Sequence, residues 1–223
     1  MEIKPRFIQR NCIEGNEIDP RQANAILKYK PDIIVFEMPQ GKNGPNTIFN
    51  IYPCNKKPIE KFNHIIKDLE ISAKKYPYAA SDILVWRNIK KMWNQGINTQ
   101  IYNVDAPKAM RSRCFKFKKP YPSIRKDWLF WIYLYSREVV ITKNIRALLE
   151  NYHIKKDPTI LIFLQSIHWN NVKFLLANPS KEEIWKHYFG NFKNIKPTKE
   201  IENQIKDRNK ILNYYWKKVQ IFY

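Results

Sequence analysis

The chain has 223 residues, and 40 Lys and Arg against 20 Asp and Glu give it a net charge of +20. Hydrophobic residues make up 44% and aromatic residues 14%, which excludes disorder over most of the chain. The length fits one domain, with or without a helical appendage. No apolar run approaches the roughly 18 residues that span a bilayer, and the N-terminus lacks a signal peptide's apolar centre. We therefore expect a soluble cytoplasmic protein with no membrane partner.

The pattern along the chain predicts an α/β fold, with a mostly parallel sheet flanked by helices and a C-terminal helical extension. Strands are expected at residues 6–10, 32–36, 98–104 and 159–164, and helices at 20–30, 57–75, 81–95, 127–152, 180–189 and 198–218. The second and fourth strands are continuous apolar runs, typical of strands buried on both faces, whereas the third alternates and is expected nearer an edge. Residues 1–178 would form the domain and 179–223 an extension packed on it.

Polar side chains follow the predicted strands where each strand ends. Glu37 ends the second strand, Asp105 ends the third, and His168 lies in the turn from the fourth strand into a helix. In open parallel sheets, ligands bind beyond the carboxyl ends of the strands, so these residues are expected to meet at one edge. The helix N-terminus adds positive potential at His168, which suits a ligand or a general base. Alternatively, these side chains cap turns or fill space.

Arg137 falls within the apolar stripe of the long predicted helix. The stripe consists of Leu134, Ile141, Ile145 and Leu148, spaced to face a core. A guanidinium cannot lose its charge, and burying it without a partner is very costly. We expect it to meet a carboxylate, Glu37 or Asp105, unless its stem packs while its head extends to solvent.

A basic segment follows Asp105. It contains Arg111, Arg113, Lys116, Lys118 and Lys119, with aromatic residues interleaved. Such a segment can follow a phosphate backbone and stack bases, can contact an anionic substrate, or can be a solvated loop. The richness in Lys, Asn, Ile and Tyr, which is typical of A+T-rich coding, also explains part of the charge. The cysteines Cys12, Cys54 and Cys114 are odd in number and widely spaced, so reduced thiols are expected rather than disulfides or structural zinc.

Three segments of the chain carry a family resemblance: Ile-Ile-Val-Phe-Glu at 33–37, Ser-Arg-Glu-Val-Val-Ile-Thr-Lys-Asn-Ile at 136–145, and Ile-Leu-Ile-Phe-Leu-Gln-Ser-Ile-His at 160–168. Together they resemble the TraB, pheromone-shutdown and Tiki-type superfamily, with its erythromycin-esterase-like and ChaN-like relatives. The similarity covers roughly residues 6–177. It implies a mixed α/β core and, from the Tiki members, a metal-dependent peptidase or hydrolase.

By position, the resemblance makes Glu37 the family's strand-end acid, Arg137 its helix arginine, and His168 the histidine of its G-x-x-H motif. A divalent ion of unknown identity would then be held by Glu37 and His168, or Glu37 would act as a base. Asp105 is a further acidic candidate that comes from the strand-end argument alone. Gln165 replaces the motif glycine and Asn11 stands where many members have histidine, so a degenerate site is an alternative.

The hypothesis from the sequence is therefore a hydrolase or peptidase with an unidentified substrate, anionic or peptide. The alternative is a basic nucleic-acid-binding protein without catalysis, and a third is an interaction protein on an enzyme-derived fold.

Overall fold

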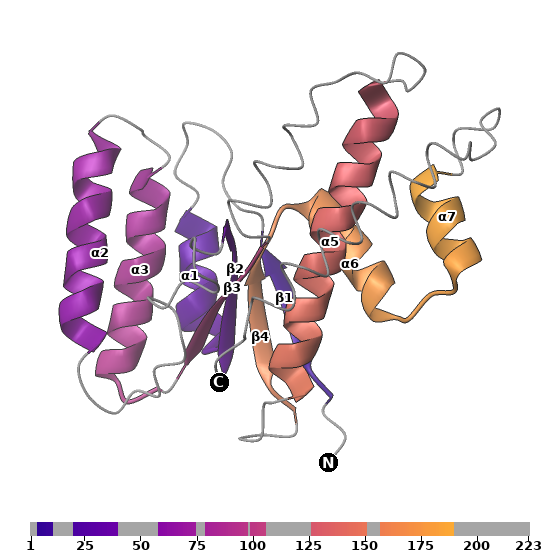
Figure 1. The fold of residues 1–223 in the computed structure, drawn as a ribbon. Helices are drawn as coiled ribbons and strands as arrows, with labels where there is room; N and C mark the ends of the chain where they lie inside the picture. The colour runs from indigo at the N-terminus through magenta and orange to yellow at the C-terminus, as the bar shows by residue number, and fades with distance from the viewer. Residues whose placement is uncertain are drawn as a thin grey trace. The chain divides into compact units, whose positions relative to one another are not determined.

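The structure is a computed structural model, and it describes residues 4–10, 20–39, 58–74, 79–97, 99–105, 126–150 and 157–189. The strands are β1 (Arg6–Arg10), β2 (Ile33–Pro39), β3 (Gln100–Asp105) and β4 (Thr159–Phe163) (Figure 1). The helices are α1 (Pro20–Tyr29), α2 (Pro58–Ala73), α3 (Ala79–Asn94), α5 (Lys126–Glu150), α6 (Ser166–Leu176) and α7 (Lys181–Phe189).

The described elements divide between two compact units that alternate along the chain. The first unit holds β1, α1, β2 to Glu37, α2, α3, the start of β3, and β4. The second unit holds the end of β3 from Asn103, then α5, α6 from Ile167, and α7.

The four strands form one sheet in the order β1-β4-β2-β3. β4 pairs in parallel with β1 and β2, so that Ile160 lies opposite both Phe7 and Ile33. The central strands are the ones whose sequences are continuous apolar runs: Ile33, Ile34, Ile160, Leu161 and Ile162 are fully buried. β3 is an edge strand, as its alternating pattern predicts. The predicted parallel α/β architecture is confirmed.

In the first unit the helices attach to the sheet through aromatic packing. Phe36 of β2 stacks on Trp86 of α3 at 5.5 Å and on Phe163 of β4 at 5.2 Å between ring centroids. α3 also contacts α1, where Asn88 Nδ2 donates to the Ala23 carbonyl at 2.9 Å. α3 ends just before Gly96, whose φ of +75° is the left-handed conformation that glycine commonly supplies after a helix.

In the second unit α5 contributes a stripe of buried apolar side chains. Leu134, Ile141, Ile145 and Leu148 are all buried, which confirms the predicted stripe. α7 begins with a capping box, because the Ser180 and Glu183 side chains each accept a hydrogen bond from the other's backbone N–H. No helix in the described part of the chain is long and apolar enough to cross a membrane.

The predicted strands and helices that fall in the described ranges are present, and their ends differ from the predicted ones by at most three residues. Outside the described residues lie the predicted helix at 198–218, Asn11 and the three cysteines. The basic segment with Arg111, Arg113, Lys116, Lys118 and Lys119 lies outside them as well.

Candidate active site

A buried ion pair joins the end of β3 to α5. Arg137 donates from Nε to Asp105 Oδ1 and from Nη2 to Asp105 Oδ2, both at 2.7 Å. The Asp105 side chain is fully buried and the Arg137 side chain is 10% exposed. This bidentate arrangement is the strongest geometry for a guanidinium and a carboxylate. Of the two carboxylates expected for Arg137, the structure places Asp105 there. Seven residues further along α5, Asn144 Nδ2 donates to the Val104 carbonyl at 2.7 Å, a second tie between the same two elements.

The third contact of the guanidinium fixes the protonation of His168. Arg137 Nη1 lies 2.9 Å from His168 Nε2, and the imidazole is buried. Arginine has no acceptor, so Nε2 must accept and therefore carries no hydrogen. His168 is consequently neutral, with its hydrogen on Nδ1, and Nδ1 lies 2.9 Å from Glu138 Oε1. The imidazole thus links a cation on one side to a carboxylate on the other.

Glu138 accepts three hydrogen bonds from two helices of the second unit, α6 and α7. Its Oε1 accepts from His168 Nδ1 and from Asn171 Nδ2, both at 2.9 Å, and its Oε2 accepts from the Tyr188 hydroxyl at 2.6 Å. Glu138 is fully buried, and these three donors are formally neutral. Hydrogen bonds to an ionised carboxylate stabilise the ionised form. We call the six residues Asp105, Arg137, Glu138, His168, Asn171 and Tyr188 the buried relay.

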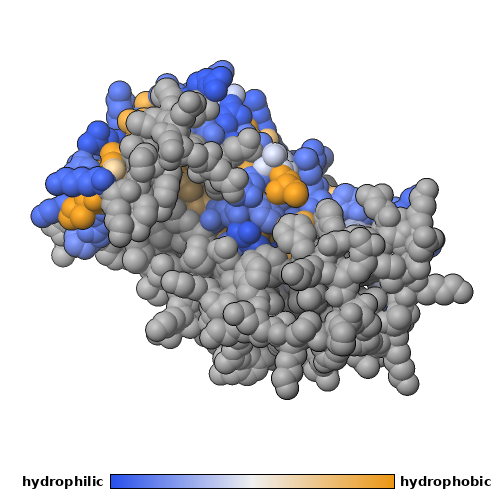
Figure 2. Space-filling model, turned by 90° about the horizontal axis from the view of Figure 1, so that it is seen from above, coloured by the Kyte–Doolittle hydropathy of each residue, from blue (hydrophilic) through white to orange (hydrophobic). Residues whose placement is uncertain are grey.

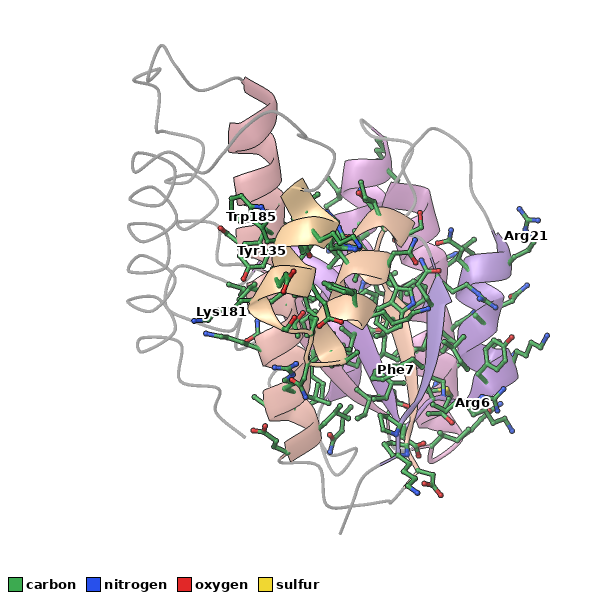
Figure 3. The ribbon with its side chains drawn as sticks, turned by 90° about the vertical axis from the view of Figure 1, so that its right-hand side faces the viewer. Arg6, Phe7, Arg21, Tyr135, Lys181 and Trp185 are labelled. Atoms are coloured by element: carbon green, nitrogen blue, oxygen red, sulfur yellow. The ribbon has the colours of Figure 1, made fainter. Side chains whose placement is uncertain are left out.

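α7 closes one side of the buried relay. Figure 3 labels Tyr135 on α5 and Trp185 on α7, the two helices that meet here. The Tyr188 ring packs edge-on against Tyr135 at 4.9 Å, and its neighbour His187 donates from Nε2 to Asn171 Oδ1 at 2.8 Å. The pKa of Tyr188 is raised, mainly by burial, then by the negative charge of Glu138 and by its hydrogen bond to that carboxylate. Burial likewise raises the pKa of Tyr135.

Glu37 has a different setting within the first unit. Its Oε2 accepts a hydrogen bond from the backbone N–H of Gln165 at 3.0 Å, which ties the end of β2 to the residues after β4. Of the four candidates from the sequence, Asp105, Arg137 and His168 are joined in the second unit, while Glu37 belongs to the first.

Three members of the buried relay were not among the predicted site residues: Glu138, Asn171 and Tyr188. Asn171 lies one helical turn after His168, so its place on the same face of α6 could have been found from spacing. Glu138 directly follows Arg137 and so lies on another face of α5. It is buried because α5 is buried around a wide part of its circumference, which also includes Ser136 and Thr142. Nothing in the local sequence signals Tyr188, because its partner Glu138 lies 50 residues earlier.

The metal that the resemblance implies does not fit His168 in this arrangement. Nδ1 donates to Glu138, and the Nε2 lone pair faces the Arg137 cation, so neither ring nitrogen is available to a divalent ion. Within the described ranges, no three His, Cys, Asp or Glu side chains group closely enough to hold a metal.

Comparison of the chain with family models, with curated proteins and with solved structures found no match.

Proposed function

We propose that this chain is a hydrolase, similar to the TraB and Tiki-type proteins, in which the buried relay supplies acid–base catalysis and charge stabilisation. The observation that carries the proposal is the protonation of His168. Its Nδ1–H donates to the Glu138 carboxylate, and its Nε2 carries no hydrogen. A neutral imidazole in this form can accept a proton from water at Nε2.

Each of the catalytic residues in the buried relay has its own role in hydrolysis. Glu138 orients the imidazole and stabilises the imidazolium that forms when His168 accepts a proton, while Asp105 positions Arg137. Water gives a proton to His168 Nε2, and its oxygen forms a bond to the acyl carbon of an ester or amide. Arg137 stabilises the oxyanion, the bond to the leaving group breaks, and His168 returns the proton to that group. No step is assigned to Glu37 or to a metal.

The contact between Arg137 and His168 must open before His168 can accept this proton. An anionic group of the substrate can draw the guanidinium from Nε2, because a charge-assisted hydrogen bond is stronger than one to a neutral imidazole. This requirement favours substrates that carry a carboxylate or a phosphate beside the scissile bond, including peptides with an acidic side chain.

The test is turnover, by the purified full chain, of a panel of chromogenic esters and fluorogenic peptides that carry a carboxylate or a phosphate beside the scissile bond. We expect His168→Ala to lower the rate by roughly 10²- to 10⁴-fold, the usual contribution of a general base. His64→Ala is the matched control, because His64 is exposed on α2 of the first unit. Glu138→Gln should lower kcat more than it changes KM, since it acts through the imidazole.

Two results would contradict this proposal. One is equal rates for folded His168→Ala and the wild type, and the other is no turnover of any substrate in the panel. A stoichiometric metal in purified protein that His168→Ala removes would favour the metal-assisted version that the resemblance implies.

A further inference from the structure

The outer side of the α2/α3 helix pair forms an open groove of about 580 Å³ in the first unit. Its lining comes from Asn63, Ile66, Lys67 and Glu70 of α2, and from Arg87, Lys90, Lys91 and Asn94 of α3. On each helix these positions follow the same spacing of three, four and seven residues, so each set lies on one helical face. Hydrophilic side chains, blue in Figure 2, gather on the side where Figure 1 draws α2 and α3. We call this feature the α2/α3 groove.

Two polar contacts cross the α2/α3 groove and satisfy part of its charge. Arg87 Nη2 donates to Glu70 Oε1 at 2.7 Å, and Lys90 Nζ donates to Asn63 Oδ1 at 2.5 Å. Lys67 and Lys91 are exposed and have no partner among the residues that the structure describes. With four cationic side chains and one carboxylate, the groove carries a local charge of +3. Exposed contacts of this kind contribute little to stability, so stability does not explain the arrangement.

We propose that the α2/α3 groove binds the phosphate backbone of a nucleic acid. The positions from 63 to 70 and from 87 to 94 each span seven residues, or about 10 Å of helix at ~1.5 Å per residue. Along a nucleic-acid duplex each strand advances ~3.4 Å of helix axis per phosphate, so that length matches about three consecutive phosphates of one strand. Lysine and arginine bind phosphate oxygens as charges, and the amides of Asn63 and Asn94 add neutral donors.

The residues that line the α2/α3 groove determine which part of a nucleic acid it would bind. None of the eight lining residues is aromatic, so the groove has no surface on which bases could stack. Binding is therefore to the backbone and independent of sequence. A nucleic acid fits better than an acidic peptide, because its charge repeats at every residue and the chain's net charge of +20 attracts a long polyanion.

This inference goes beyond the proposed hydrolase and does not depend on it. All eight lining residues belong to the first unit, and every member of the buried relay belongs to the second. It also places nucleic-acid binding at residues other than the basic segment that the sequence suggested. Variants of the groove therefore test this inference without changing the relay.

The first experiment compares two double charge reversals by fluorescence anisotropy with a labelled RNA duplex of about 20 base pairs, longer than the phosphates the groove spans, and the full chain. Lys67→Glu with Lys91→Glu reverses two exposed lysines of the groove. Lys4→Glu with Lys181→Glu is the control, because both lysines are exposed and the total charge changes equally. We expect the groove variant to bind at least tenfold more weakly than the control variant. The slope of log affinity against log salt should fall by about two, one for each phosphate that the lysines no longer neutralise.

The second experiment raises the charge of the groove. Glu70→Gln removes the carboxylate that pairs with Arg87, so the affinity for RNA should rise several-fold. Glu182→Gln, at an exposed position on α7, changes the total charge equally and should have a smaller effect. Equal effects of groove and control variants in both experiments would overturn the inference. The inference would also be overturned if poly-glutamate displaced the labelled RNA at the same concentration of charge as unlabelled RNA does, because the groove would then bind acidic proteins.

Discussion

Two arginine–carboxylate pairs in this protein have the same length and opposite surroundings. Arg137 and Asp105 lie 2.7 Å apart with side chains 10% and 0% exposed, whereas Arg87 and Glu70 lie 2.7 Å apart with side chains 56% and 48% exposed. In the buried pair both ions have lost their water, so each depends on the other. In the exposed pair water solvates both ions and salt screens their attraction. Burial, and not distance, therefore decides what each pair does.

The difference extends to the neighbours of each pair. The Arg137 guanidinium also donates to His168, so its position fixes the protonation of an imidazole and, through it, the contacts of Glu138. Arg87 lies beside two exposed lysines, Lys67 and Lys91, in a groove open to solvent. The buried pair suits chemistry that needs fixed positions, and the exposed pair suits a surface whose charges rearrange around a ligand.

The largest expected effect is that of Arg137→Met. It removes the cation that donates two hydrogen bonds to Asp105 and one to His168, while the side chain keeps a similar apolar length. Breaking a buried pair from one side costs roughly 3–5 kcal/mol of the free energy of unfolding. Urea unfolding followed by circular dichroism measures it, with Arg87→Met as the matched control at under about 1 kcal/mol. Equal losses for the two variants would remove the distinction between the pairs.

The sequence predicted the strands well because burial leaves a simple pattern in them. β2 and β4 are buried on both faces and read as unbroken apolar runs, and β3 at the edge alternates. Helix ends were less certain, since α2 was expected at 57–75 and spans Pro58–Ala73. Ends depend on capping and local contacts that hydrophobic periodicity does not record.

The candidate site could be predicted only in part, for a physical reason. The cost of burying a charge led from Arg137 to a carboxylate, and the strand-end rule led to Asp105 and His168. Glu138 was missed because an apolar stripe identifies one face of a helix, whereas α5 is buried over a wider arc that includes Ser136. Tyr188 reaches Glu138 only through the packing of α7 beside α5, which is long-range information.

A smaller loss is expected for Tyr188→Phe. The variant removes the 2.6 Å hydrogen bond to Glu138 Oε2 and leaves that buried oxygen without its hydroxyl donor. Hydrogen bonds to charged groups contribute about 1.5–3 kcal/mol, so the free energy of unfolding should fall by that amount at neutral pH. Tyr29→Phe, whose hydroxyl accepts from Arg10 at 3.3 Å in the first unit, is the control and should lose less. A loss for Tyr188→Phe no larger than for Tyr29→Phe would show that Glu138 does not need this donor.

The same tyrosine predicts a dependence on alkaline pH. The pKa of Tyr188 is raised by burial and by Glu138, so the folded protein keeps the proton above pH ~10, where the unfolded chain releases it. The contribution of the hydroxyl is complete below pH ~10 and declines above it by about 1.4 kcal/mol per pH unit until the folded-state pKa is passed. The stability difference between wild type and Tyr188→Phe should therefore shrink as the pH rises from about 9 to 11. A difference that stays constant over this range would show that Tyr188 titrates normally.

The smallest expected effect is the coupling between Arg87 and Glu70. A double-mutant cycle of Arg87→Gln and Glu70→Gln should give a coupling free energy between 0 and about 1 kcal/mol, and added salt should reduce it further. The corresponding cycle of Arg137→Met and Asp105→Asn should give a larger value that salt changes little, because burial excludes the screening ions. Chemical denaturation of the four variants and two doubles at low and high salt measures both couplings. A salt-resistant coupling above about 1 kcal/mol at Arg87 would mean that this exposed pair holds α2 to α3, and the contrast with the buried pair would then be lost.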